Sequence, residues 1–158
     1  MNDMNLVVSA KISQGKSNQR DQLAGWPVDQ TGPLAAPAEI TLWGSAPLAL
    51  LRLTLDPASA SLSAVATGGC RHYFRLADAT LRPLPAEAAL ALARGDAYIA
   101  LSPGALRLAD SPAIARYLHL YDGFNAERLA EGLLRHLAQE SGQAEFPEDV
   151  TVIVVEAR

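Results

Sequence analysis

The pattern of hydrophobic and polar positions divides the chain into a long strand-rich part, a helical part and one last strand. Short apolar stretches bounded by polar or Gly/Pro turns predict strands. We expect them at residues 5–12, 23–28, 39–43, 48–55, 62–66, 72–76, 80–84 and 97–101. The stretch 48–55 is typical, because Leu51, Leu53 and Leu55 alternate with polar residues as in a strand with one buried face.

The turns between these strands indicate how the strands pair. We expect residues 5–12 and 23–28 to form a hairpin across the polar loop 13–22. The short strands between residues 62 and 84 are expected to form an antiparallel meander. Residues 29–38 contain Gly and Pro and predict a connection. Residues 85–93 fit either a helical turn or a loop.

Beyond residue 110 the apolar residues recur at helical spacing. Ser111 followed by Pro112 predicts an N-cap and the first helical residue. A second helix is expected to start at Asn125, with Phe124 placed for a hydrophobic staple. This helix carries an apolar stripe opposite a charged face, and Gly142 is expected to end it as a C-cap.

The last strand, at residues 150–155, is the most apolar stretch of the chain. It consists of Val and Ile apart from Thr151, which is also β-branched, and such a run favours a strand buried on both faces. Glu148 and Asp149 lead into it. Carboxylates at the mouth of a rigid central strand are well placed to hold a metal. They also fit a polar lead-in that only ends the strand, and the sequence leaves both interpretations open.

Strands followed by two helices and a final strand predict an α+β fold, with an antiparallel sheet and helices packed on an outer face. The length of 158 residues fits one domain, 1–158, with residues 1–4 expected to be disordered. Hydrophobic residues make up 49% of the chain and charged residues 19%, which is typical of globular proteins.

The remaining composition excludes several classes of partner. The net charge of −4, without a basic stripe, argues against binding to nucleic acid. The chain lacks a signal-like N-terminus and an apolar run of ~20 residues, so we expect a cytoplasmic protein that does not cross a membrane. The single cysteine, Cys70, excludes an internal disulfide and a cysteine-based metal cluster.

Three stretches in order carry a family resemblance. Residues 50–84 read as strand–turn–strand into a Gly-containing bend, followed by two more strands. Residues 94–106 (RGDAYIALSPGAL) place Gly-Asp before an apolar strand, and residues 148–157 (EDVTVIVVEA) place an acidic pair before another. Residues 15–21 (GKSNQRD) add a weaker match. In combination the chain resembles the metal-dependent protein phosphatases (the PPM family), in the branch of the sporulation stage II E phosphatases.

This resemblance implies an antiparallel β-sandwich flanked by helices. It also implies, in active members, a dinuclear Mn or Mg centre that is held by aspartates and activates a water to attack phosphoserine or phosphothreonine. Hard divalent cations prefer several carboxylate oxygens, and two such cations clamp the phosphoryl oxygens. Here the two long helices expected after the second strand are replaced by residues 29–47, so one helical layer is expected to be reduced.

The matched positions depart from the family pattern. Asp21 matches the aspartate of the N-terminal loop, but Arg20 stands where an acidic or amide residue is usual. The bridging aspartate has no clear counterpart, and Asp29 is the nearest carboxylate. Pro103 replaces the aspartate of the Ser-Asp-Gly motif and cannot ligate a metal.

At the last motif Glu148 takes the usual ligand position, with Asp149 beside it. Two surviving carboxylates are too few to offset the charge and dehydration of two divalent ions. Arg20 is a candidate for binding an anion such as a phosphoryl group, although a plain surface arginine is the commoner case.

The sequence therefore predicts a shortened PPM-like domain without the standard dinuclear centre and without a metal cofactor. It would act as a non-catalytic signalling module that binds a regulatory or phosphorylated protein. The alternative is a minimal Mn- or Mg-dependent serine/threonine phosphatase that uses Asp21, Asp29, Glu148 and Asp149. A third hypothesis is a homo-oligomer formed through sandwich edges that the missing helices leave exposed.

Other candidate groups have structural interpretations. Cys70 and His72 would share one face of a strand, but no third group completes a nucleophile or metal site, so packing is the commoner role. His119 and His136 are expected to be partly exposed helix residues. Ser102 lacks an elbow pattern for a nucleophile. Asp96, after Gly95, is interpreted as a turn residue, and residues 121–123 as an interhelical turn.

Overall fold

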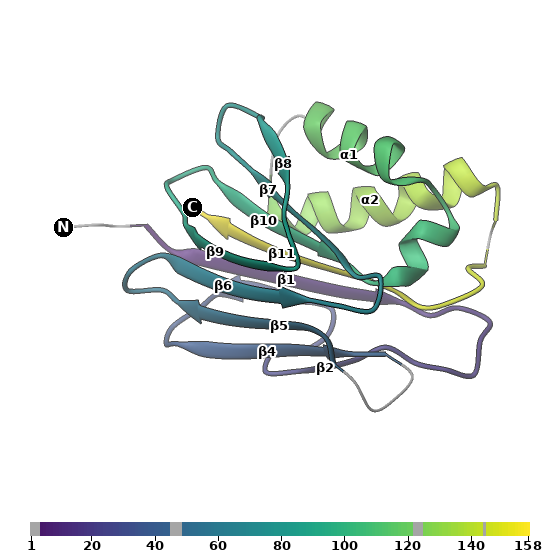
Figure 1. The fold of residues 1–158 in the computed structure, drawn as a ribbon, viewed down its shortest axis with the longest axis horizontal. Helices are drawn as coiled ribbons and strands as arrows, with labels where there is room; N and C mark the ends of the chain where they lie inside the picture. Colours follow the sequence, from purple (N-terminus) through teal and green to yellow (C-terminus); the bar gives the residue numbers. More distant parts are fainter. Residues whose placement is uncertain (1–3, 45–48, 122–124, 144) are drawn as a thin grey trace.

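The computed structural model of the chain describes residues 4–44, 49–121, 125–143 and 145–158. Two antiparallel sheets face each other, and both helices cover the outer face of one of them (Figure 1). The six-stranded sheet has the order β3 (Gln30–Pro33), β1 (Leu6–Ser13), β11 (Val150–Ala157), β10 (Ala97–Leu101), β7 (Arg71–Arg75) and β8 (Leu81–Pro83). The five-stranded sheet has the order β2 (Gln22–Ala24), β4 (Ala38–Trp43), β5 (Ala49–Asp56), β6 (Ser61–Ala66) and β9 (Glu87–Ala91).

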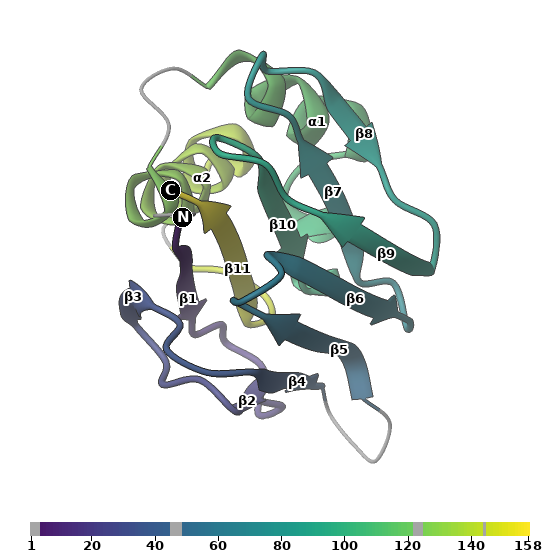
Figure 2. The same ribbon diagram turned by 90° about the vertical axis from the view of Figure 1, so that its left-hand side faces the viewer.

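These layers confirm the predicted α+β sandwich with a reduced helical layer. The helices α1 (Ser111–Leu120) and α2 (Ala126–Ser141) lie on the six-stranded sheet. In the described part of the chain no helix covers the outer face of the five-stranded sheet (Figure 2). Among the described residues, no helix is long and apolar enough to cross a membrane.

Strand β11 contributes to both cores, as its run of β-branched, mostly apolar residues predicts. Ile153 and Val155 belong to the core between the two sheets, whereas Val152 and Val154 belong to the core under the helices. Every residue of this strand is buried. A strand at this position needs apolar side chains on both faces, and this requirement explains its continuous Val and Ile run.

The helix ends follow ordinary capping chemistry, with one correction. Asp110, not Ser111, is the N-cap of α1, because its extended backbone lets its carboxylate accept a hydrogen bond from the amide of Ala113 at 2.8 Å. Asn125 caps α2 as predicted, and Gly142 ends that helix with φ 65°. The staple residue Phe124 and the turn at residues 122–123 lie outside the described residues.

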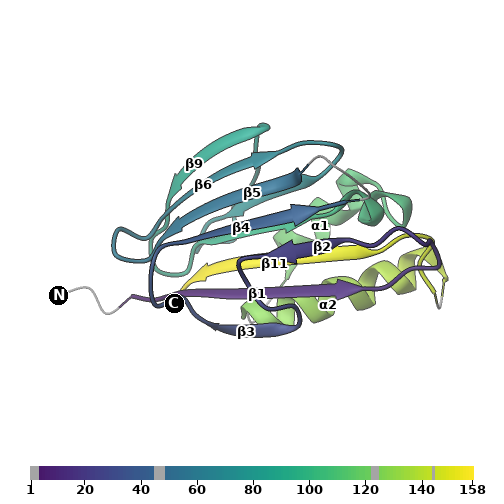
Figure 3. The ribbon, with the colours of Figure 1, turned by 90° about the horizontal axis from the view of Figure 1, so that it is seen from below.

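The predicted hairpin between the first two strands is wrong. Strand β1 pairs with β3 and β11, whereas β2 pairs with β4 in the opposite sheet (Figure 3). The cause is the loop between β1 and β2, which is held across the lead-in to β11. The amide of Lys16 donates to the carbonyl of Phe146 at 2.8 Å, and the amide of Ser17 donates to that of Pro147 at 3.1 Å. The loop therefore delivers the chain to the second sheet.

Two further predictions need correction. The meander breaks after β6, because Gly68 and Gly69 adopt φ 62° and 88° and the chain crosses to the other sheet before β7. Strands β5 and β6 do pair, as do β7 and β8. Two segments without a predicted strand form edge strands: β3 replaces part of the connection at 29–38, and β9 replaces the turn or loop at 85–93.

Candidate functional site

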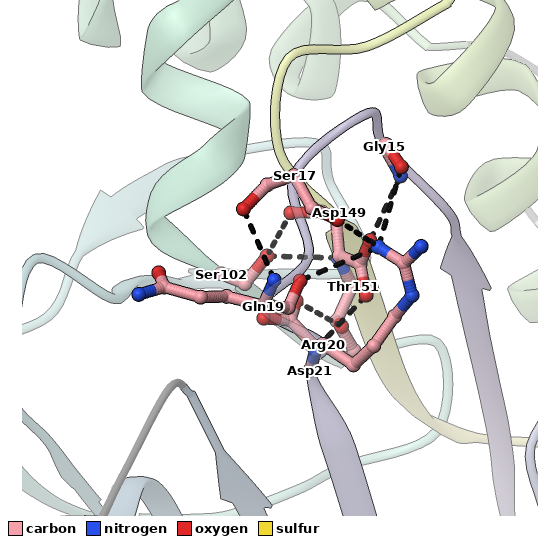
Figure 4. Close-up of polar contacts among 8 residues, drawn as sticks. All are labelled: Gly15, Ser17, Gln19, Arg20, Asp21, Ser102, Asp149 and Thr151. Atoms are coloured by element: carbon pink, nitrogen blue, oxygen red, sulfur yellow. Dashed lines mark hydrogen bonds and ion pairs between the residues drawn. The ribbon is translucent and has the colours of Figure 1, made fainter.

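Three acidic residues singled out by the sequence, Asp21, Glu148 and Asp149, gather at one end of the sandwich. The loop after β1, the end of β10 and the lead-in to β11 meet there (Figure 4). Arg20, Asp21, Glu148 and Asp149 line one cavity of about 180 Å³ at this end. The structure thus brings together the four residues that the predicted metal or anion site contains.

The carboxylate of Asp149 is the centre of this cluster. Its Oδ1 accepts hydrogen bonds from the amide of Gly15 at 2.8 Å and from Nη1 of Arg20 at 3.1 Å. Its Oδ2 accepts from the amide of Asp21 at 2.9 Å. The residue is 3% exposed, so these contacts replace water. A carboxylate has about four acceptor positions, and three of them are filled by this chain's own donors.

Arg20 supplies the positive charge beside Asp149. Its Nη1 also contacts the carbonyl oxygens of Gly15 and Ser17, which fixes the guanidinium within the loop. The arginine side chain is 40% exposed, whereas that of Asp149 is 2% exposed. Arg20 therefore compensates a buried charge from a half-exposed position, and it is not the plain surface arginine of the commoner interpretation.

Asp21 lies beside this pair and is half-buried. Its Oδ2 accepts a hydrogen bond from the hydroxyl of Thr151 at 2.6 Å. Burial raises the pKa of Asp21 above its usual range; the hydroxyls of Thr151 and Ser102 oppose this shift, while the charges of Asp149 and Glu148 add to it. Burial therefore destabilises the charged form of Asp21, and its hydrogen bonds offset only part of this effect.

Ser102 and Thr151 join β10 to β11 under the cluster, and sequence reasoning missed both roles. The hydroxyl of Ser102 accepts from the amide of Thr151 at 2.8 Å and lies 3.5 Å from the carbonyl of Asp149. Ser102 is 1% exposed, and its hydroxyl is engaged by the backbone of Thr151 and Asp149 and by the carboxylate of Asp21, so it is not available as a nucleophile. The available signal was Thr151, the one polar residue in the apolar run from Val150 to Val155.

Glycines let three backbone segments meet at this point. A Cβ atom on Gly15 would lie 2.3 Å from the carbonyl carbon of Glu148, and one on Gly104 would lie 2.2 Å from the carbonyl oxygen of Asp149. Each glycine therefore lies in close contact with the backbone of the acidic pair, and the two glycines come from different segments of the chain. The loop of Gly15 and the 3-10 turn that begins at Pro103 hold the pair between them.

The other carboxylates are placed differently. Glu148 points to the rim of the cavity and pairs with Nε of Arg107 at 3.2 Å. Asp29, which the alternative hypothesis places in the site, is exposed and hydrogen-bonds through its amide to the carbonyl of Ala10, three residues before the end of β1. Asp96 is buried and accepts from the amides of Ala77 and Ala93, which supports a turn role.

Cys70 and His72 are buried but engage separate partners. The thiol of Cys70 donates to the carbonyl of Leu101 at 3.1 Å, and burial raises its pKa to about 12. His72 hydrogen-bonds the hydroxyl of Tyr98 at 2.9 Å, and burial lowers its pKa. A thiol with a high pKa is a poor nucleophile, so this geometry favours the packing role.

The two helix histidines lie away from these groups. His119 is exposed and contacts the carbonyl of Ala79, and half-buried His136 stacks on Tyr117. Both are thus helix residues with exposed surface, as predicted.

The donor set does not fit a dinuclear metal centre. Among the described residues, no three His, Cys, Asp or Glu side chains are arranged to hold a metal ion. The most buried carboxylate, that of Asp149, already binds two amides and a guanidinium. Pro103 offers no side-chain oxygen at the motif position. What the arrangement can do chemically is hold the loop of residues 15–21 against the lead-in to β11 through one buried charge.

The pKa shift of Asp21 gives a pH prediction. A raised pKa means that the folded state favours the protonated acid. This contribution to stability is complete below the unfolded value of 3.8 and is lost as the pH rises through the folded pKa. Asp21→Asn removes the titration and keeps an oxygen for Thr151. We expect the free energy of unfolding of this variant, minus that of the wild type, to increase from about pH 3 to about pH 7.

Urea unfolding at a series of pH values measures this difference. Asp29→Asn, a surface aspartate at φ 62° where Asn is well tolerated, is the matched control for loss of one charge. A difference that decreases with rising pH would contradict the assignment of Asp21 as a desolvated acid.

Comparison with known proteins identifies solved structures that have a similar fold. No family model and no curated protein matches the sequence, but solved structures match its fold. The phosphatase domain of the cell fate determinant SpoIIE from Bacillus subtilis aligns with a TM-score of 0.73 at 12% identity, over 99% of this chain and 94% of that domain. The RsbU and RsbW domains of a Mycobacterium tuberculosis protein align at 0.72 and 11%, over 98% of this chain and 62% of the other.

RsbX in complex with magnesium aligns with a TM-score of 0.64 at 13% identity, over 100% of this chain and 98% of RsbX. At these identities the likeness concerns the fold. It confirms the fold expected from the resemblance, and it spans 94% of the SpoIIE domain and 98% of RsbX. The chain therefore has the fold of the SpoIIE-like branch of metal-dependent (PP2C-type) protein phosphatases.

Proposed function

We propose that this chain is a non-catalytic domain with the metal-dependent phosphatase fold, and that it works in signalling by binding a regulatory or phosphorylated protein. The observation that carries the proposal is the state of Asp149. Its carboxylate, at the position of the family's acidic motif, is filled by the amides of Gly15 and Asp21 and by the guanidinium of Arg20. A metal ion bound by this carboxylate would compete with these three contacts at a residue that is only 3% exposed.

The remaining groups support the same proposal. Arg20 puts a positive charge where a divalent ion would require negative charge, and the two cations would repel each other. Pro103 lacks a ligand atom, and Glu148 is paired with Arg107. A preserved scaffold with these substitutions favours recognition over phosphoryl chemistry. SpoIIE, which shares the fold, is a cell fate determinant, and this is consistent with a regulatory role.

The direct test is an assay with Mn and Mg at millimolar concentrations, on a generic aryl phosphate and on a phosphoserine peptide. We expect no turnover above the blank, and no heat of metal binding in calorimetry. Turnover that Asp21→Ala abolishes would overturn the proposal and establish the alternative, a minimal metal-dependent phosphatase. Turnover that disappears on repurification would come from a contaminating enzyme, whereas metal-dependent turnover that stays with the repurified Asp21→Ala chain would also overturn the proposal.

A further inference from the structure

Helices α1 and α2 lie side by side on the six-stranded sheet (Figures 1 and 2). Cavities lined by side chains of both helices open on the outer surface of this layer. One cavity of about 690 Å³ is lined in part by Arg116, Tyr117 and Leu120. An adjoining cavity of about 420 Å³ adds Arg128 and Arg135. Both share the aromatic side chains of Tyr117, Tyr121 and His136, so together they form one groove, which we call the helix groove.

The floor of the helix groove is aromatic and held in place. The rings of Tyr117 and His136 stack at 4.4 Å, and the ring of Tyr121 lies 5.8 Å from that of Tyr117. A Cβ atom on Gly132 would lie 2.6 Å from the hydroxyl of Tyr117, so the absence of a side chain there lets the tyrosine lie across α2. Leu120 is 62% exposed beside this floor, an unusual exposure for a large apolar side chain.

Buried Arg75 fixes one end of the groove. Its Nε donates to the carbonyl of Leu118 at 3.0 Å, and its Nη2 donates to the carbonyl of Tyr121 at 2.8 Å. These bonds fix the C-terminal end of α1 on the sheet. Leu120 and Tyr121 are therefore presented by a rigid element, and the exposed apolar surface is a stable feature of the fold.

The charge of the helix groove is opposite to that of the whole chain. The chain carries a net charge of −4, yet the groove presents three exposed arginines, Arg116, Arg128 and Arg135, and none of them forms an ion pair with a described residue. Of its carboxylates, Glu131 is neutralised by Lys11 at 3.1 Å, which leaves Glu140. The uncommitted charge of the groove is thus positive.

We propose that the helix groove binds an acidic, amphipathic helical segment of a partner protein. Apolar residues of that segment would pack on Tyr117 and Leu120, and its carboxylates would pair with the arginines. Arg128 and Arg135 lie seven positions apart on α2, or about 10 Å, which matches acidic residues two turns apart on a helix laid along the groove. The inference rests on the proposed function, since it names the surface and the partner chemistry of that binding module.

The test uses the full chain and a synthetic helical peptide with Leu on one face and Glu on the other. One control peptide carries Lys in place of Glu, and a second carries Ala in place of Leu. We expect fluorescence anisotropy to show binding of the Leu/Glu peptide and affinities at least about tenfold weaker for both controls. The double change Arg128→Glu with Arg135→Glu, and separately Leu120→Ser, should each weaken binding of the Leu/Glu peptide by about tenfold or more.

The matched control variant is Arg52→Glu. Arg52 is exposed on the outer face of β5, away from the helices, and forms no ion pair with a described residue, so this change should leave binding unaltered. All changed residues are exposed, and thermal unfolding verifies that the variants fold. Equal affinity for the Lys peptide, or unchanged affinity of the arginine variants, would overturn the proposal. Binding of anionic lipid vesicles, or self-association through this face, in place of the peptide would also overturn it.

The outcomes separate this inference from the proposed function. Metal-dependent turnover by the chain would end the non-catalytic proposal and leave peptide binding in the groove to be judged by the anisotropy alone. Absence of turnover together with failure of the peptide to bind would contradict the proposed binding of a helical segment in the helix groove. The non-catalytic proposal would be unaffected.

Discussion

Arg20→Met should lower the free energy of unfolding by about 1–3 kcal/mol, the cost of leaving a buried charged acceptor without one of its partners. The variant keeps much of the apolar stem but removes the guanidinium that lies 3.1 Å from Asp149. With Arg20 in place the Asp149 side chain is 2% exposed, so the variant leaves a largely buried carboxylate with one partner fewer. Removal of the cation also releases its contacts to the carbonyls of Gly15 and Ser17. Urea denaturation at about pH 7 measures the loss.

Two companion variants make this result specific. Arg20→Lys keeps the charge but not the planar fork, so it should recover only part of the lost stability. Arg52→Met removes an exposed arginine from the open face of β5 and should change the free energy of unfolding by less than about 0.5 kcal/mol. Equal effects of Arg20→Met and Arg52→Met would mean that Arg20 does not compensate Asp149.

Gly104→Ala should destabilise the fold by about 1–3 kcal/mol or more, because a methyl group there meets backbone rather than a movable side chain. Its Cβ would lie 2.2 Å from the carbonyl oxygen of Asp149. Gly15→Ala should act similarly through the backbone of Glu148, at 2.3 Å. Relief would require the 3-10 turn or the loop to move away from the acidic pair, and such a movement would break the contacts of Asp149. Thermal or urea unfolding of each variant gives the size of the effect.

Gly32→Ala is the matched control, since a Cβ atom on Gly32 would have nothing within 4 Å. It lies in β3, at the edge of the six-stranded sheet, and replacement there should be close to neutral. A neutral result at all three glycines would show that the segments around Asp149 are free to separate, contrary to the tight packing described above.

Several strands and helices could be predicted from local sequence patterns, because local chemistry determines where these elements form and end. The Val and Ile run of β11 needs burial on both faces wherever it lies, and Asn125 and Gly142 end α2 through their own side chain and backbone freedom. Strand partners could not be predicted in the same way. Gly68 and Gly69 read equally well as a hairpin turn and as a crossover, and the choice depends on which sheet has room for β7.

The candidate site was likewise predictable in its residues but not in the contacts of their side chains. The resemblance brought Arg20, Asp21 and the acidic pair together, because ordered motifs imply a shared site even when their chemistry has changed. It could not reveal that Asp149 turns inward while Glu148 turns to the rim. That difference depends on the amides of Gly15 and Asp21, which are backbone groups and leave no trace in the identity of the side chains.

The pairing of β1 with β11 also has a kinetic consequence. Leu6 lies opposite Ala157, and the register continues to Ser13 opposite Val150, so the first strand of the sheet pairs with the last along its whole length. Contacts between residues so far apart in sequence form slowly, because loop-closure entropy must be overcome before they add stability. During synthesis β1 must wait, with one hydrogen-bonding edge unpaired, until β11 has left the ribosome. In that interval the nascent chain offers an open strand edge to chaperones and to other copies of itself.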